Sequence, residues 1–309
     1  MTQSANRRLA VFSTALTAVT YALLVFGSSV RVHGAGLACP DWPLCFGEVI
    51  PALDFQVFLE WGHRVLAGGV SLGYVALMWA VFRDGERRRR IGWLTAVGAM
   101  VLATQVVLGG LTVLELLAEW TVASHLTTGN TFCLILLLHA LFFWDQVRDI
   151  RRQPVTLIQR LSASQLVLLV PAQLVLGGLV AASHAGLACG TWPGCNGPAW
   201  FPTFEGIIGL QVMHRIVAYT LVTAAVLNLA VNGLRGRVGR ASLLVTALIV
   251  GQACLGIANV LLRMPVEVTL LHSAGAAAIV LATTWLQFEV WRAPLEEVAP
   301  AGHIAMEGK

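Results

Sequence analysis

Eight long apolar runs limit what this chain can fold into more than any other feature of its sequence. Each has close to the roughly 20 residues that an α-helix needs to cross the hydrocarbon of a bilayer. The composition agrees, because 57% of the residues are hydrophobic and 12% are charged, whereas a soluble domain carries about 25% charged residues. The sequence therefore predicts an all-α membrane protein with eight transmembrane helices. We expect them at Leu9–Val30, Phe58–Phe82, Ile91–Leu114, Thr121–Trp144, Leu161–Ala182, Ile208–Val231, Ala241–Leu262 and Val268–Trp291.

Arginines are concentrated before the first run and in every second connection after it. The opposite connections hold only Arg31 and Arg263, both at helix ends. By the positive-inside rule, the arginine-rich connections and both termini are cytoplasmic. The first run is longer than the roughly 7 to 15 apolar residues of a signal peptide, so we expect it to remain as a helix. Topology accounts for the basic residues, and no nucleic-acid partner is expected.

The chain consists of two copies of one four-helix unit. Ala35-Gly-Leu-Ala-Cys39 recurs as Ala185-Gly-Leu-Ala-Cys189, and further pairs recur at the same offset of about 150 residues. Similarity at a fixed offset is the signature of a repeated structural unit. Four is an even number of spans, so both copies enter the membrane from the same side and form parallel repeats. We expect two four-helix bundles, 1–152 and 153–309, with the boundary in a charged connection that contains Pro154.

Four histidines occupy matching places in the two copies, namely His63 and His125 in the first and His214 and His272 in the second. Ionisable residues inside a membrane are rare and usually functional. Each lies one to two turns below the outer end of an even-numbered helix, so all four imidazoles are expected at one depth. Two histidines that face each other across a bundle can ligate a haem iron from both sides.

Two alternatives compete with haem ligation by these histidines. A single histidine in a helix is most often explained by an interhelical hydrogen bond, but four at matching places favour a shared function. Zinc prefers four tetrahedral ligands, and no further ligand appears at close spacing. The pattern therefore favours one bis-histidine haem site in each half.

Polar residues near these histidines have two interpretations each. Arg64 and Arg215 directly follow a histidine and could pair with haem propionates, or they could be interfacial arginines that reach toward water. Gln105 and Gln252 could orient a ligand or form hydrogen bonds across helices, and we favour the latter.

The halves differ next to the first histidine of each copy. Glu60 precedes His63 by three residues and shares its helix face, whereas Gln211 stands at the matching position of the second half. A carboxylate in a membrane is costly unless it is used or paired, and it could act as a proton-transfer group. The alternative is a structural ion pair with Arg64. The asymmetry suggests that the first half performs chemistry and the second carries a stable cofactor.

Two pairs of cysteines lie in the first and third outer connections, and the pairs are Cys39 with Cys45 and Cys189 with Cys195. Their spacing matches neither a zinc site nor a thioredoxin-type motif. The compartment outside the cytoplasm is oxidising, so we expect two disulfides, each within one loop. A thiol–disulfide redox role for the first pair is an alternative.

The residues that carry these features resemble the haem A synthase family. The matching stretches are Cys39-Pro-Asp-Trp-Pro-Leu-Cys45, Glu60-Trp-Gly-His63-Arg64, Leu108-Gly-Gly-Leu-Thr-Val113 ahead of His125, His214-Arg215 and His272. The resemblance covers all eight predicted helices. It implies a membrane oxidoreductase that converts the C8 methyl group of haem O to a formyl group, which yields haem A for terminal oxidases.

The resemblance also implies a role for each site residue. His214 and His272 would bind the iron of haem b, a resident cofactor, and His63 and His125 would receive haem O, with Glu60 as the essential acidic residue. It implies the cytoplasmic membrane of a prokaryote, with haem O synthase, terminal-oxidase biogenesis factors and an electron donor as partners. A di-haem b-type electron carrier and a haem transporter or chaperone are the alternatives. The difference between Glu60 and Gln211 argues for chemistry.

Overall fold

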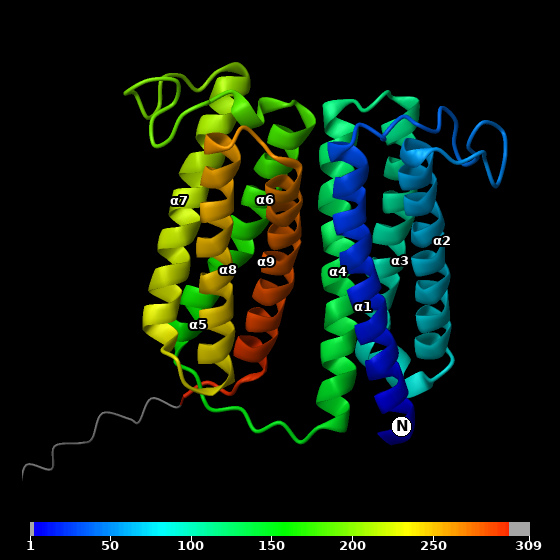
Figure 1. Cartoon of the computed structure of the whole chain (residues 1–309). Helices are drawn as coiled ribbons and strands as arrows, with labels where there is room; N and C mark the ends of the chain where they lie inside the picture. Colours follow the sequence, from blue (N-terminus) through cyan, green and yellow to red (C-terminus); the bar gives the residue numbers. More distant parts are fainter. Residues whose placement is uncertain (1–2, 297–309) are drawn as a thin grey trace, which may run out of the picture.

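The computed structural model describes residues 3–296, where the regular secondary structure is helical, with two isolated β-bridges and no strand (Figure 1). Eight segments are long and apolar enough to cross a membrane, which confirms the predicted all-α membrane fold. The helices are α1 (Gln3–Val32), α2 (Phe55–Phe82), α3 (Gly85–Leu114), α4 (Glu119–Val147), α5 (Leu157–Ser164), α6 (Leu166–Ala182), α7 (Gly206–Asn232), α8 (Gly236–Leu261) and α9 (Val266–Arg292), with a 3-10 turn, η1 (Ala185–Leu187).

Most helices are longer than the apolar runs that predicted them. α1 begins at Gln3 and therefore includes Arg7 and Arg8, and α3 begins at Gly85 inside an arginine-rich segment. An apolar run marks the part of a helix within hydrocarbon, whereas helical hydrogen bonding continues into the polar surface region. The sequence therefore located the spans but not the helix ends.

The fifth span departs most from its prediction. The expected continuous helix Leu161–Ala182 begins earlier, at a capping box formed by Thr156 and Gln159, and is interrupted at Gln165 between α5 and α6. Pro171 lies inside α6, where it has no N–H to donate to the preceding turn. The carbonyl that this proline leaves without a helical donor is that of Val167, inside α6, so Pro171 does not account for the interruption at Gln165.

The helices form two groups of four spans, α1 to α4 and α5 to α9, and each group has its own apolar core (Figure 1). The groups meet where α1 and α4 pack against α6 and α9. Gly178 of α6 allows close approach, because a Cβ there would lie 3.5 Å from the Cα of Ala123 in α4. The Tyr21 hydroxyl of α1 donates to the carbonyl of Ala274 in α9 at 3.1 Å. The start of α1 and the end of α9 lie at the same end of the molecule.

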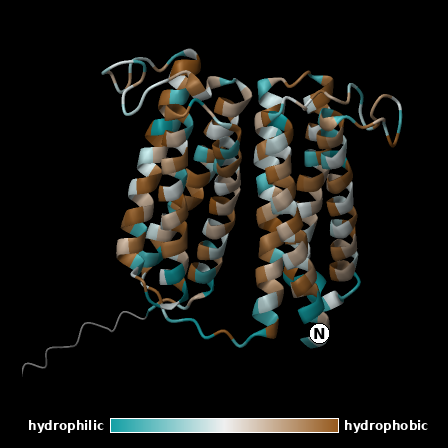
Figure 2. Ribbon diagram, in the orientation of Figure 1, coloured by the Kyte–Doolittle hydropathy of each residue, from teal (hydrophilic) through white to brown (hydrophobic). Residues whose placement is uncertain are grey.

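The outer surface of the bundle suits lipid. Leu72 and Leu168 are 74% and 77% exposed, and many other large apolar side chains point outward. Figure 2 shows mostly white to brown helix bodies and a hydrophilic linker between α4 and α5. Such a surface would be an aggregation hazard in water and is ordinary in a bilayer.

Candidate haem-binding sites

The structure brings the histidines together within each half. His63 on α2 and His125 on α4 lie within electrostatic range of each other, and His214 on α7 and His272 on α9 repeat this arrangement. All four rings are partly buried. Each half therefore presents one histidine pair between its helices, as the haem hypothesis requires.

A glycine on the preceding helix packs against each of the four imidazoles. Any larger residue there would push the ring, so these glycines fix where the rings lie. The pairs, with the distance from an ideal Cβ on the glycine to the imidazole Cε1 atom, are Gly27–His63 (2.9 Å), Gly109–His125 (3.1 Å), Gly177–His214 (3.2 Å) and Gly256–His272 (3.2 Å).

The imidazole nitrogens fit a cofactor whose metal ion already has most of its ligands from the cofactor itself. The Nδ1 atoms of all four histidines are buried and have no hydrogen-bond partner in residues 3–296, although buried polar atoms are normally paired. The same part of the chain holds no group of three or more histidine, cysteine or acidic side chains that could bind a metal ion. Two histidines suit a porphyrin, because its four nitrogens would complete the coordination of the iron, and two are too few for tetrahedral zinc.

Glutamines accompany three of the four histidines. Gln105 Nε2 lies 3.3 Å from His125 Nε2, and Gln252 donates to the backbone carbonyl of His272 at 2.7 Å. Both expected glutamines thus bond across helices, and Gln105 also contacts the ring itself. Sequence reasoning missed Gln173, whose Nε2 lies 3.4 Å from Nε2 of His214.

A spacing shared by the three glutamines could have revealed Gln173. Each stands four residues before the glycine that touches a histidine, and Gln173 with Gly177 follows this rule. Leu23 occupies the equivalent place before Gly27, and His63 has no hydrogen-bonding side chain beside it among the described residues. The first site is therefore less symmetric than the second.

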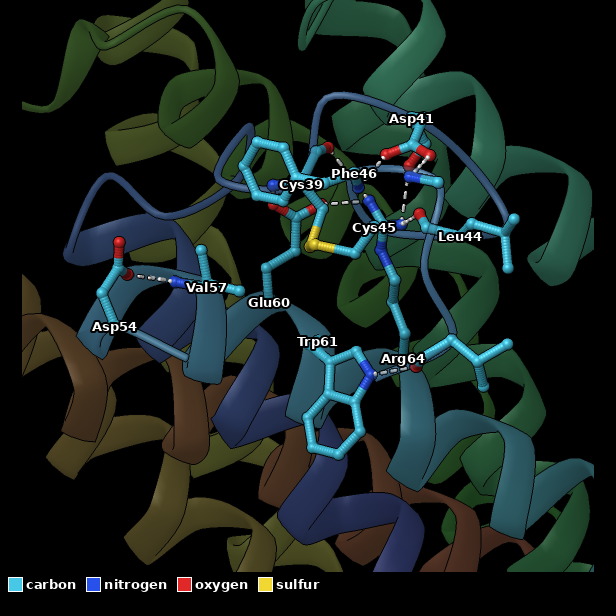
Figure 3. The surroundings of a disulfide bond; sticks show 12 residues. Cys39, Asp41, Leu44, Cys45, Phe46, Asp54, Val57, Glu60, Trp61 and Arg64 are labelled. Atoms are coloured by element: carbon cyan, nitrogen blue, oxygen red, sulfur yellow. Dashed lines mark hydrogen bonds and ion pairs between the residues drawn. A yellow bond between two sulfur atoms is a disulfide. The ribbon is translucent and has the colours of Figure 1, made fainter. Parts of the chain in front are cut away.

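Glu60 and Arg64 point from α2 toward the first cysteine loop (Figure 3). Glu60 is only 5% exposed. One carboxylate oxygen pairs with Arg64 at 2.5 Å, and the other accepts the N–H of Cys39 at 2.8 Å. The ion pair that the sequence left as an alternative is thus present. It holds the carboxylate one turn from His63 and directly beneath the loop.

The two arginines are partners of the cysteine loops. Arg64 donates to the carbonyls of Asp41 and Leu44 at 2.8 and 2.7 Å. Arg215 donates to the carbonyls of Cys189 and Thr191 at 2.8 and 2.9 Å. Binding of haem propionates by these guanidinium groups remains a prediction, because the contacts in the structure are to loop carbonyls.

Gln211 does not reproduce the role of Glu60. Its amide donates to the carbonyl of Gly186 at 3.2 Å, and its oxygen is buried without a partner among the described residues. Arg215 has no acidic partner there and gives its hydrogen bonds to carbonyls alone. The charged pair beside the histidine is therefore a property of the first half.

Each cysteine loop is closed by a disulfide, as the sequence predicts. Cys39 is bonded to Cys45 and Cys189 to Cys195. In the first loop the carboxylate of Asp41 accepts the N–H groups of Phe46 and Gly47 at 2.6 and 2.8 Å. The hydrogen bond from Gly47 is the main reason why the pKa of this exposed carboxyl is lowered. Backbone hydrogen bonds thus shape the loop in addition to its disulfide.

The remaining histidines lie away from these pairs. His139 is fully buried, with one ring nitrogen 2.9 Å from the Thr95 hydroxyl and the other 2.8 Å from a backbone carbonyl. His33 contacts Phe55 edge-on, and His184 is an exposed residue with a φ of 53° in the third outer loop. His303, expected in a polar tail, lies outside the described residues.

Substitution of the ring-contacting glycines should weaken haem binding. Gly177→Ala places a Cβ 3.2 Å from the His214 ring, so we expect the affinity for the second-half haem to fall roughly tenfold, as for other residues that orient a metal ligand. Gly68→Ala is the matched control, because a Cβ at Gly68 meets nothing within 4 Å. Haem content and the absorption spectrum of the purified variants measure the effect. Equal haem content in both variants would contradict it.

Comparison with known proteins agrees with this arrangement. Residues 10–57 and 52–284 match the COX15-CtaA family, described as cytochrome oxidase assembly protein. Similar proteins named haem A synthase include one from Shewanella oneidensis, 28% identical over 88% of this chain and 93% of its own length. The protein from Brucella ovis is 30% identical over 90% of this chain and 89% of its own length. The protein from Bradyrhizobium sp. (strain ORS 278) is 34% identical over 74% of this chain and 68% of its own length. The resemblance noted in the sequence is thus confirmed, and the chain belongs to the COX15-CtaA family of cytochrome oxidase assembly proteins.

Proposed function

We propose that this protein is a haem A synthase, which oxidises the C8 methyl group of haem O to a formyl group. The observation that carries the proposal is the pair of glycine-packed histidines in each half, whose buried Nδ1 atoms have no partner among the described residues. The relatives named haem A synthase support it, because they match across nearly the whole chain.

The two halves would divide the work. His214 and His272 would hold haem b as a resident cofactor, and His63 and His125 would receive haem O as substrate. Haem iron supplies the oxidising power that protein side chains lack. Residues 1–152 and 153–309 are then the substrate half and the cofactor half.

The chain's own residues would position the substrate and handle protons. Glu60 is the acidic residue nearest His63 in sequence, and its ion pair with Arg64 fixes it at the loop. The carboxylate would hold or transfer a proton as the methyl group is oxidised. The disulfide-closed loop above it would limit access of water to the first site.

We infer that the reaction takes place near the outer surface of the cytoplasmic membrane. The arginine-rich connections would face the cytoplasm, so the cysteine loops and the histidine sites would lie toward the oxidising side. Haem O synthase and terminal-oxidase biogenesis factors are the proposed partners, together with an electron donor.

A di-haem electron carrier is the second candidate, since the histidine–glycine contacts are nearly the same in the two halves. A carrier would bind two haems and change neither.

Identification of the haems made in cells separates these functions. The chain is produced with a haem O synthase in a host that contains no haem A, and the extracted haems are identified by mass. We expect haem A beside haem b. Extracts that hold only haem O and haem b, from folded protein that retains haem, would contradict the proposed synthase and favour the carrier.

A further inference from the structure

The two halves differ in how the first turn of an equivalent helix is capped. The N-cap of α3 is Asp84, whose carboxylate accepts the N–H groups of Glu86 and Arg87 at 3.1 and 3.0 Å. The matching helix, α8, has Arg235 as its N-cap, and no side chain caps its first turn. The first N–H groups of a helix carry partial positive charge and attract anions. In α8, Arg235 stands where α3 has Asp84, so these N–H groups have no carboxylate acceptor and a positive side chain lies beside them.

A cavity of about 160 Å³ lies at this uncapped helix start, at the end of the second half that carries the arginine-rich connections. A single water fills about 30 Å³ of liquid, so the cavity has room for a phosphate group. The α8 start contributes Arg235, Arg237 and Val238, the linker contributes Gln153, and α7 contributes Asn232.

Asn232 lines the cavity with a buried amide side chain. The residue is 8% exposed, and its Oδ1 atom is buried without a partner in the described part of the chain. Its Nδ2 atom already donates to the side chain of Asn228 at 2.8 Å, which fixes the amide with the oxygen left over. The donors that the cavity offers to an anion therefore come from the α8 start and its arginines.

Positive charge exceeds negative charge around the cavity. Glu289 is the only acidic residue that lines it, and its two oxygens pair with Arg237 and Arg152 at 2.7 and 3.1 Å. Arg235 is exposed and makes no hydrogen bond or ion pair with another described residue. The positive charge of Arg235 and the partial positive charge of the α8 start are thus not balanced by a negative group among the described residues.

We propose that this cavity binds the phosphate group of an anionic phospholipid. Helix starts bind phosphate through their N–H groups, and basic pockets between transmembrane helices on the cytoplasmic side bind anionic headgroups. The cavity lies where the α7–α8 connection and the linker meet, so a lipid here would hold the linker to the second half. This binding does not depend on the proposed haem chemistry.

Arg235→Asp tests the proposal, because it gives α8 the acidic cap that α3 already has. The haem-loaded protein in neutral detergent is titrated with phosphatidylglycerol, phosphatidylcholine or inorganic phosphate, and thermal unfolding is followed. We expect phosphatidylglycerol to raise the unfolding temperature of the native protein more than the other two. Arg235→Asp should need at least tenfold more of this lipid for the same shift, since an attractive charge becomes a repulsive one.

Arg89→Asp is the matched control, because it makes the same charge change at an exposed α3 residue on the same side. Arg235→Gln removes the charge without adding a cap, and should lose the lipid effect to a smaller extent. An unchanged lipid response in Arg235→Asp, or an equal loss in Arg89→Asp, would overturn the site. Equal protection by inorganic phosphate would overturn the assignment to a lipid.

Discussion

Glu60→Gln is expected to reduce the formation of haem A by a hundredfold or more, while haem b stays bound at His214 and His272. General acid–base catalysis by a positioned side chain contributes about 10²- to 10⁴-fold, and glutamine cannot carry the proton. Haem O, or a partly oxidised form such as the alcohol, should accumulate. Extracted haems are identified by mass, and haem b is measured in the same preparation.

Glutamine is the informative replacement because Glu60 also has a structural role. Its carboxylate pairs with Arg64 and accepts the N–H of Cys39. Glu60→Ala should also abolish haem A formation, but it removes the acceptor of the Cys39 N–H and the acidic partner of Arg64, which disturbs the loop. Glutamine keeps an oxygen for the Cys39 N–H, and the second half folds with Gln211 at this position. If Glu60→Gln makes haem A at the normal rate, Glu60 is a structural residue and the asymmetry between the halves has no catalytic meaning.

His214→Ala and His272→Ala should each remove the low-spin haem b from the purified protein. Each substitution deletes one of the two proposed haem ligands, and alanine offers no replacement. The absorption spectrum and the haem extracted per protein measure the loss. His139→Ala is the control, because this histidine is buried but bonds only to Thr95 and a backbone carbonyl. Unchanged spectra in both axial variants would remove the second half as the cofactor site.

The spans and the four histidines could be predicted from the sequence because both are strong local signals. About 20 apolar residues define a span whatever surrounds them, and a histidine within such a run is conspicuous. The break at Gln165 was not predictable in this way, because apolar residues continue on both sides of it. The residue at the break is a glutamine, which is a good helix former and gives no warning of an interruption.

The surroundings of the histidines were harder to predict, because they depend on which faces of neighbouring helices meet. Gly27 and Gly177 contact rings on the next helix, and in the sequence they resemble any small residues in a membrane helix. The ion pair of Arg64 with Glu60 was one of two alternatives for the carboxylate, and the bonds of Arg64 to Asp41 and Leu44 required the folded loop. Gln173 was missed for the same reason as the glycines.

The linker sets the order in which this protein can be completed during synthesis. Arg152 pairs with Asp145 at the end of α4 and with Glu289 in α9. Val155 exchanges backbone hydrogen bonds with Pro294 and Glu296 at 2.9 and 3.0 Å. Asp145 leaves the ribosome before Arg152, but the other partners belong to the last span and the segment after it. Domains form in order from the amino terminus, so the first four spans can pack early, whereas the connection that joins them to the second half becomes fixed only when the final span has been inserted.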